Sequence, residues 1–144
     1  MSTPRSPGFL APPDERGDIA QVALMSGIDG LIVANATVAR PPTLKSHHAH
    51  EPGGLSGPVL FQASTALLAE MYRLTSGKLP LVGTGGISSG EDAYTKIRAG
   101  ASLVQLYTVL ALQGPGLVTR IKRELLACLA RDGFAKLGDA VGKG

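Results

Sequence analysis

The chain has 144 residues, of which 44% are hydrophobic and 17% are charged, and its formal net charge is +3. This length corresponds to one domain, and the apolar fraction is too high for an intrinsically disordered chain. A single Cys excludes an internal disulfide framework. The basic residues are scattered and do not alternate with the three Tyr and three Phe residues, which argues against a nucleic-acid-binding surface.

The N-terminal segment differs in composition from the rest of the chain. Residues 1–13 are rich in proline and are expected to form a disordered leader, with the folded domain over 14–144. The start of the chain has neither an apolar signal core nor the acid-poor, arginine-rich pattern of a transit peptide. No window reaches the roughly 18 apolar residues of a membrane helix. We therefore expect no targeting or membrane segment in this sequence.

The first half of the folded region predicts a helix, a strand, a long loop and a second helix. Apolar spacing from Asp14 onward predicts a helix that ends at Gly27. An apolar run over 30–34 predicts a buried strand. Residues 35–63 carry proline and glycine clusters and predict an irregular connection, which at this length is functional or disordered. Ser64 is the expected N-cap of the next helix.

The second half repeats the alternation. Strands are predicted over 79–83 and 101–107. Between them, Ser88 and Ser89 each precede an acidic residue by three positions, a spacing typical of a helix start. Pro115 is suited to the first turn of a last helix. Alternating helices and apolar strands indicate an α/β fold with a parallel sheet, either an open doubly wound sheet or part of a TIM-type barrel, because three strands cannot close a barrel.

The strongest local signal is the segment GTGGISSG over 83–90, which lies between a predicted strand and a predicted helix. Glycines let the backbone approach a ligand, and the free N–H groups at a helix start attract anions such as phosphate. The same sequence is also compatible with an ordinary tight turn. The strand that follows ends in Tyr107-Thr108, so backbone N–H groups of Gly85, Gly86, Tyr107 and Thr108 are candidates to converge on one phosphate, with the Thr108 hydroxyl as a further donor.

Other polar residues have less specific patterns. Asn35 follows the first predicted strand and is either a ligand-binding amide or a turn residue. The glycine-rich loop over 53–57 either covers a ligand or is flexible. The histidines at 47, 48 and 50 lack acidic or Cys partners at metal-binding spacing, which favours a solvated loop over a metal site.

The residues themselves give little support for a catalytic function. Cys128 lies on the apolar stripe of the last predicted helix, so a buried, unreactive thiol is expected. The sequence contains no recognisable Ser/His/Asp set, paired carboxylates or redox Cys pair. The residues alone therefore predict ligand binding rather than catalysis.

Four segments together resemble one family. GLIVAN (30–35), GGLSG (53–57), GTGGISSG (83–90) and IRAGASLVQLYT (97–108) are similar to dihydroorotate dehydrogenase of the quinone-dependent class. That family is an FMN-dependent TIM-type (β/α)8 barrel. The chain resembles only its C-terminal half, roughly the last three βα units.

The resemblance implies a role for each matching residue. Gly57, Gly86, Tyr107 and Thr108 match contacts to the FMN phosphate and ribityl chain, and Ser56 and Gly85 match neighbouring flavin contacts. Asn35 matches an amide that binds the dihydroorotate or orotate ring. Ala34 and Ala36 replace hydroxyl residues of the family that contact the flavin and the substrate. Two lost hydrogen bonds of about 1 kcal/mol each would weaken binding roughly 30-fold.

The implied activity is FMN-dependent oxidation of dihydroorotate to orotate with a quinone as acceptor. By resemblance, it belongs at the mitochondrial inner membrane or the bacterial cytoplasmic membrane. The family's base serine lies in its N-terminal half, so no catalytic residue is expected in this chain. The family lysine at the flavin ring has only Phe9 or a gap as counterpart. The alternatives are a truncated, non-catalytic fragment, which either folds poorly or pairs with another half-barrel, and another phosphate-binding barrel enzyme.

Overall fold

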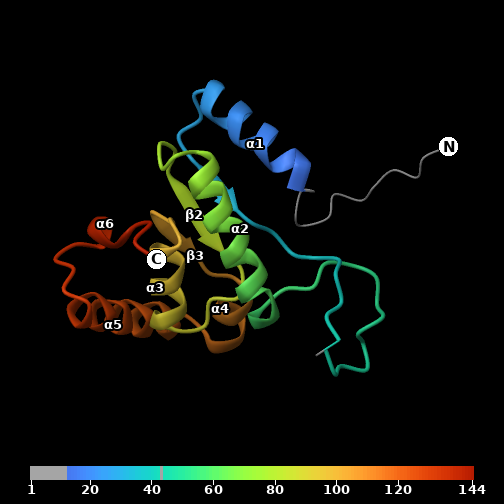
Figure 1. Cartoon of the computed structure of the whole chain (residues 1–144). Coiled ribbons are helices and arrows are strands. Elements are labelled where there is room, and N and C mark those ends of the chain that lie inside the picture. The colour runs from blue at the N-terminus through green and yellow to red at the C-terminus, as the bar shows by residue number, and fades with distance from the viewer. Residues whose placement is uncertain (1–12, 43) are drawn as a thin grey trace.

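A three-stranded parallel sheet organises the molecule. The computed structural model describes residues 13–42 and 44–144 (Figure 1). The strands are β1 (Leu31–Val33), β2 (Leu81–Thr84) and β3 (Leu103–Gln105), in spatial order β1-β2-β3. The predicted α/β class with parallel strands is confirmed. Residues 1–12 of the predicted leader lie outside the described residues.

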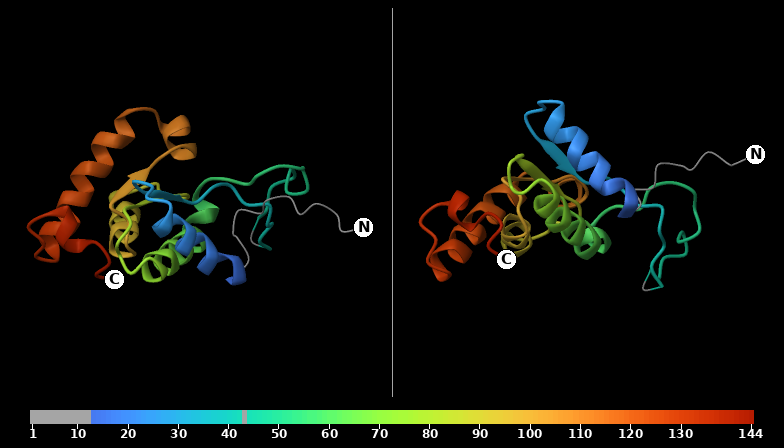
Figure 2. Two further views of the ribbon diagram at one scale, coloured as in Figure 1. Left: turned by 90° about the horizontal axis from the view of Figure 1, so that it is seen from above. Right: turned by 45° about the horizontal axis from the view of Figure 1, so that its top comes forward.

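Helices follow each strand, as predicted, with three short additions. In chain order the helical elements are α1 (Pro13–Met25), the 3-10 helix η1 (Pro58–Leu60), α2 (Phe61–Leu74), α3 (Gly90–Arg98), α4 (Thr108–Gln113), α5 (Gly116–Arg131) and α6 (Leu137–Ala140). The unexpected ones are η1, α4 and α6. Figure 2 shows α5 running beside α3, while the connection after β1 projects away from the sheet.

The strand ends differ from the predicted ones: β1 and β3 are shorter at both ends, whereas β2 begins later but extends one residue further, to Thr84. The clearest difference is at β3, which ends at Gln105 rather than at residue 107. Tyr107 is the N-cap of α4, and Thr108 is its first residue. The apolar run continues past the strand because it also supplies the buried face of the next helix, where Val109 is 5% exposed.

Helix starts follow local capping chemistry at α3 but not at α2. The Ser89 hydroxyl accepts a hydrogen bond from the Asp92 N–H at 3.1 Å, as predicted for a helix N-cap. The predicted N-cap at Ser64 is wrong, because α2 begins after Leu60 and Ser64 lies buried inside it. A preceding turn of 3-10 helix leads the chain into α2, so Ser64 hydrogen-bonds inside the helix instead.

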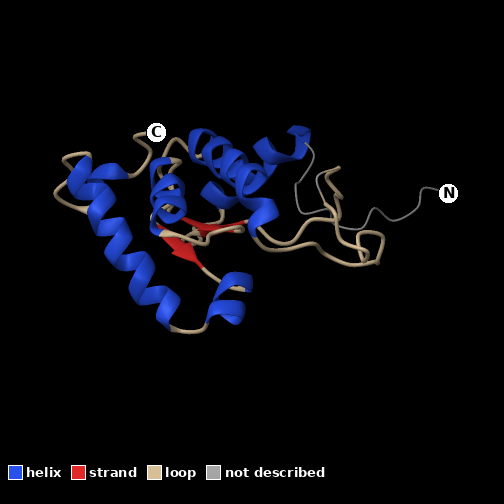
Figure 3. Ribbon diagram, turned by 90° about the horizontal axis from the view of Figure 1, so that it is seen from below, coloured by secondary structure: helices blue, strands red, loops and turns tan. Residues whose placement is uncertain are grey.

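The two faces of the sheet are in different environments. On one face, Val33 and Leu81 pack into the main core with apolar residues of α2, α3 and α5, and the buried Cys128 belongs to this core as predicted. Figure 3 shows the longer helices gathered on one side of the three strands. On the other face, Ile32, Val82 and Leu103 pair across the sheet in one row. Ile32 is 59% exposed and Leu103 is 62% exposed. Parallel sheets normally have both faces covered, so this row is an apolar surface that the described part of the chain leaves open.

Candidate functional site

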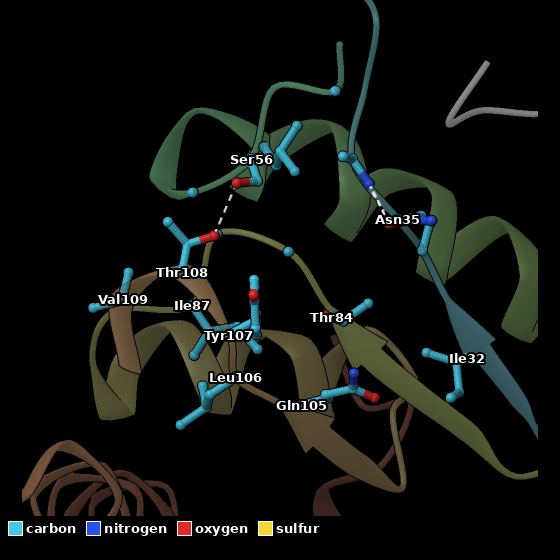
Figure 4. A pocket seen from close by; sticks show the side chains of 17 residues that line it. Ile32, Asn35, Ser56, Thr84, Ile87, Gln105, Leu106, Tyr107, Thr108 and Val109 are labelled. Atoms are coloured by element: carbon cyan, nitrogen blue, oxygen red, sulfur yellow. Dashed lines mark hydrogen bonds between the residues drawn. The ribbon is translucent and has the colours of Figure 1, made fainter. Parts of the chain in front are cut away.

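A cavity of about 550 Å³ lies where the three strands end. Its walls come from the segments that follow β1, β2 and β3 and from the loop before η1 (Figure 4). This is the carboxyl edge of a parallel sheet, where α/β proteins bind ligands. All nine residues that the resemblance singles out line it: Ala34, Asn35, Ala36, Ser56, Gly57, Gly85, Gly86, Tyr107 and Thr108.

The turn after β2 has a conformation that requires glycine. Gly85 and Gly86 have φ angles of +92° and +80°, in the left-handed region. A Cβ atom on Gly86 would lie 2.5 Å from the backbone nitrogen of Phe61 at the start of α2. A Cβ atom on Gly85 would lie 3.0 Å from the Ser64 Oγ atom. The turn therefore approaches α2 more closely than any other residue type would allow.

Four backbone donors at the cavity are free to bind a ligand. The N–H groups of Gly85, Gly86, Tyr107 and Thr108 donate no hydrogen bond to any residue in the ranges 13–42 and 44–144. N–H groups that line a cavity and have no partner in the protein are available to an acceptor on a ligand. These are the four donors that the sequence predicts to converge on a phosphate.

The glycine-rich loop over 53–57 contacts the start of α4 from the other side of the cavity. The Thr108 hydroxyl donates a hydrogen bond to the Ser56 Oγ atom at 3.0 Å (Figure 4). Gly57 is buried, with a φ angle of +96°, and a Cβ atom there would contact the Thr108 methyl at 3.4 Å. Residues far apart in the sequence thus form one continuous wall.

The segment after β1 forms the opposite wall. The Asn35 Oδ1 atom accepts a hydrogen bond from the Ala36 N–H at 2.8 Å, the local bond of a turn residue (Figure 4). Asn35 also lines the cavity, so both interpretations of this residue remain compatible with the structure. Ala34 and Ala36 are half-buried and offer the cavity only methyl groups.

Sequence reasoning missed several polar groups at the site. Thr84 and Gln105 are paired in register at the ends of β2 and β3, and both line the cavity. Their position as the last residue of a parallel strand was the available signal. Lys96 on α3 lies directly behind the turn and is fully buried. Its place between Ala93 and Ile97 on the apolar face of the helix was a signal that a lysine had been drawn into the core.

The histidines and the cysteine lie outside the cavity. The histidines at 47, 48 and 50 are exposed, as the solvated-loop prediction requires, and His48 Nδ1 lies 2.5 Å from a Glu51 carboxylate oxygen. In the described ranges, no three His, Cys, Asp or Glu side chains are grouped as metal ligands. Burial and the nearby Glu91 carboxylate raise the pKa of the Cys128 thiol to about 11, so it is protonated and a poor nucleophile at neutral pH.

These features define a class of protein. The chain is an α/β protein with a neutral cradle of backbone amides, suited to a phosphate-like anion, at the carboxyl edge of its parallel sheet. The cavity is also lined by apolar and polar residues on the β1 side, among them Ile32 and Asn35.

Comparison with known proteins gives the family. The family model described as dihydroorotate dehydrogenase matches residues 10–129. The dihydroorotate dehydrogenase (quinone) of Parvibaculum lavamentivorans is 64% identical over 129 residues, which are 90% of this chain and 37% of the relative. The mitochondrial dihydroorotate dehydrogenase (quinone) of Oryza sativa is 60% identical over 87% of this chain and 27% of its own length. The ligand-free structure of the enzyme from Eimeria tenella superposes with a TM-score of 0.89, at 46% identity, over 92% of this chain and 37% of that one.

The chain therefore belongs to the dihydroorotate dehydrogenase family and is a homologue of its quinone-dependent members. It spans about a third of the length of these relatives. Relatives from bacteria and from plant mitochondria are similar to it. Within the described residues, no helix combines the length and apolar character needed to cross a bilayer.

Proposed function

We propose that this chain supplies the FMN phosphate site and part of the substrate pocket for oxidation of dihydroorotate to orotate with a quinone as electron acceptor. The observation that carries the proposal is the set of four unpaired N–H groups at 85, 86, 107 and 108 around one cavity. Family membership supplies the identity of the ligand. FMN combines a phosphate dianion, for which the four N–H groups would be donors, with a planar ring system.

The residues present suit this cofactor. A phosphate takes several donors, and the amides of Gly85 and Gly86 lie where a Cβ atom would have no room. Gly57, Gly86, Tyr107 and Thr108 would hold the phosphate and ribityl chain, with Ser56 and Gly85 beside them. A volume of about 550 Å³ is within the usual range for cofactor pockets. When bound, FMN supplies the hydride acceptor for dihydroorotate and the route for electrons to the quinone.

The wall after β1 would face the ring systems. Asn35 would hydrogen-bond to the dihydroorotate or orotate ring, with Ala36 beside it and Ala34 toward the flavin. Because Ala34 and Ala36 carry no hydroxyl, the proposal includes weaker ligand binding at this end of the cavity. Donors such as the Asn35 amide orient a planar ligand but do not remove protons from carbon at neutral pH.

The proposal places 14–144 as the C-terminal half of a barrel, covering roughly the last three βα units. The open row of Ile32, Val82 and Leu103 and the two unpaired sheet edges would then contact a complementary half-barrel, in the same polypeptide or in another. That half would bring the base that takes a proton from dihydroorotate. If the complete protein passes electrons to a quinone, it would act at the mitochondrial inner membrane or the bacterial cytoplasmic membrane.

The first experiment is a visible absorption spectrum of the purified 144-residue chain, followed by titration with FMN. Flavin bound at one equivalent is the expected result, because the amide cradle lies entirely within this chain. Mixing the flavin-loaded chain with the preceding part of the Parvibaculum relative should then allow dihydroorotate to bleach the flavin absorbance. Bound flavin that is never bleached would favour a non-catalytic fragment. Binding of a sugar phosphate in preference to FMN would favour another phosphate-binding barrel enzyme.

A further inference from the structure

Lys96 is a buried cation with no buried anion beside it. Its side chain is fully buried on α3, and its Nζ atom donates to the Ser64 Oγ atom at 2.6 Å and to the Thr84 carbonyl at 3.3 Å. The same atom lies 5.3 Å from the centre of the Phe61 ring. No carboxylate in the described ranges forms a salt bridge with it. Buried charges are normally paired, so this one calls for a partner.

The contacts of Lys96 fix the direction of the turn's amides. Lys96 holds the Thr84 carbonyl, and Ser64 Oγ lies 3.0 Å from the Gly85 carbonyl. Both peptide units are trans, so each N–H points away from the carbonyl of its own unit. The N–H groups of Gly85 and Gly86 are therefore directed away from Lys96 and Ser64. This orientation explains why they find no acceptor on the α2 side.

The pKa of Lys96 lies close to neutral pH. Burial lowers its pKa to about 8, and Asp92 on the same helix partly offsets this shift. The Asp92 carboxylate accepts hydrogen bonds from the N–H and hydroxyl of Ser88 instead of contacting Nζ. The groups of α2 and β2 that contact Nζ, from Phe61, Ser64 and Thr84, carry no charge. Lys96 is thus protonated at pH 7 and loses its proton within the next two pH units.

We propose that Lys96 is a positioning residue of the anion site, which directs the Gly85 and Gly86 N–H groups into the cavity and supplies the positive charge that a bound phosphate dianion balances. The inference rests on the proposed function for the identity of the ligand, but its physical content concerns the anion alone. An anion in the cavity would compensate the buried ammonium across one layer of peptide. The lysine would in return favour a flavin that carries a phosphate over one that does not.

The test compares FMN with riboflavin, which lacks the phosphate, and adds inorganic phosphate as a third probe. Flavin fluorescence and phosphorus NMR would report binding to the full chain between pH 7 and pH 9, where the phosphate monoester of FMN stays dianionic. The Lys96→Met variant should bind FMN about tenfold more weakly, equal to about 1.4 kcal/mol, and riboflavin within about twofold of the wild type. The control is Lys122→Met, which removes the same charge from an exposed site on α5 and should change neither.

The wild-type chain provides a test that needs no variant. Its affinity for FMN should fall about fivefold from pH 7 to pH 9 as Lys96 deprotonates, whereas its affinity for riboflavin should stay level. Ser64→Ala should also weaken FMN more than riboflavin, because it removes the hydroxyl that accepts from Lys96 and lies 3.0 Å from the Gly85 carbonyl. Equal losses for both flavins in Lys96→Met, together with a flat wild-type profile, would overturn the inference and leave Lys96 as a core residue only.

The outcomes separate the two proposals. If the wild-type chain binds inorganic phosphate but no flavin, the proposed function fails, and loss of phosphate binding in Lys96→Met still supports the inference. If it binds FMN and Lys96→Met binds it equally well at pH 7, the inference fails and the proposed function stands. A wild-type chain that binds neither phosphate nor flavin would overturn both.

Discussion

The β2–α3 turn and the β1–α2 connection line the same cavity, but they are stabilised in different ways. The first spans only 85–89 and is held by glycine sterics, by the Ser89 cap and by the buried Lys96–Ser64 pair. The second runs from 34 to 57, and its two ends are joined by the Thr37–Leu55 bridge. The end of the cavity formed by Gly85 and Gly86, the proposed anion end, is therefore built by short-range contacts to the core. The opposite end, formed by residues 34–36 and proposed to face the ring systems, depends on a long surface loop.

The difference has a functional consequence. A rigid cradle binds its ligand without ordering cost, while a loop that must be ordered reduces the affinity of whatever it covers. We infer that the proposed anion end binds a phosphate in the isolated chain. The opposite end, which would face the flavin and substrate rings, would reach full affinity only when the complementary half-barrel covers it. Substitutions at the two ends should therefore differ in their effects, and the most damaging one is expected in the turn after β2.

Gly86→Ala should abolish phosphate binding at the turn after β2. The new Cβ atom would lie 2.5 Å from the Phe61 nitrogen, and φ is +80°, so both the turn and the start of α2 must move. We expect a loss of about 3 kcal/mol or more in the free energy of unfolding and no measurable FMN binding. Urea denaturation followed by circular dichroism would measure the first, and fluorescence titration the second.

Gly133→Ala is the matched control for that variant. Gly133 has a similar φ angle of +75°, but a Cβ atom there would contact nothing within 4 Å. Only backbone strain remains, with an expected cost of about 1 kcal/mol and unchanged FMN affinity. Similar costs for the two alanine variants would mean that the contact with Phe61 does not constrain the turn.

Lys96 should give the free chain an unusual pH dependence of stability. Because its pKa is about 8 in the folded chain and about 10.5 when unfolded, the unfolded state binds more protons between these values. Stability should therefore rise with pH over that window, by about 2 to 3 kcal/mol relative to Lys96→Met. The comparison with the variant cancels the opposite contribution of Cys128, whose raised pKa of about 11 costs stability above pH 9. Identical pH profiles for the two chains would show that Lys96 is not desolvated as described.

The contrast between short-range and long-range contacts also explains which parts of the fold and of the site the sequence predicts. Strand and helix order, the Ser89 cap and the location of Gly85 and Gly86 follow from local patterns, since each depends on neighbouring residues. The start of α4 was missed because TVLALQ is too short to show a helical period. Ser64 was misplaced because a 3-10 turn, which has no sequence period of its own, precedes α2. The role of Lys96 depends on contacts with α2 and β2, which no local pattern contains.

The ring end of the cavity can be strengthened by restoring hydroxyl groups. Ala34→Thr should raise the affinity for FMN about fivefold, and Ala36→Ser should raise the affinity for orotate about fivefold in the flavin-loaded chain completed by the preceding half. Serine is preferred at 36 because a Cβ atom on Gly54 would already lie 2.7 Å from the Ala36 methyl, which leaves little room.

Ala39→Ser is the control for these hydroxyl variants. It adds a hydroxyl to the same loop at an exposed position that does not line the cavity. The affinities for FMN and for orotate, followed by the change in flavin absorbance, should both be unchanged in this variant. An equal gain from all three substitutions would indicate a general effect on the loop rather than new ligand contacts.

Arg40 should matter for the loop and hardly at all for the fold. Its guanidinium donates to the carbonyl groups of Ala49, Glu51 and Gly53 at 2.8–2.9 Å, and so holds the middle of the connection together. Arg40→Ala should speed tryptic cleavage after Lys45 about tenfold, because local opening no longer breaks these bonds. The substitution removes no competing cleavage site, since Arg40 precedes a proline and trypsin does not cut such a bond. Mass spectrometry of the fragments would follow the rate of this one cut.

Arg40→Ala should leave the stability of the fold and the binding of FMN almost unchanged. The free energy of unfolding should change by less than about 0.5 kcal/mol, as should that of the exposed α5 control Arg123→Ala. FMN affinity should be unchanged, since the cradle after β2 is held without Arg40. A parallel loss of FMN binding would contradict the independence of the two ends and would tie the loop to the anion site through the Ser56–Thr108 hydrogen bond.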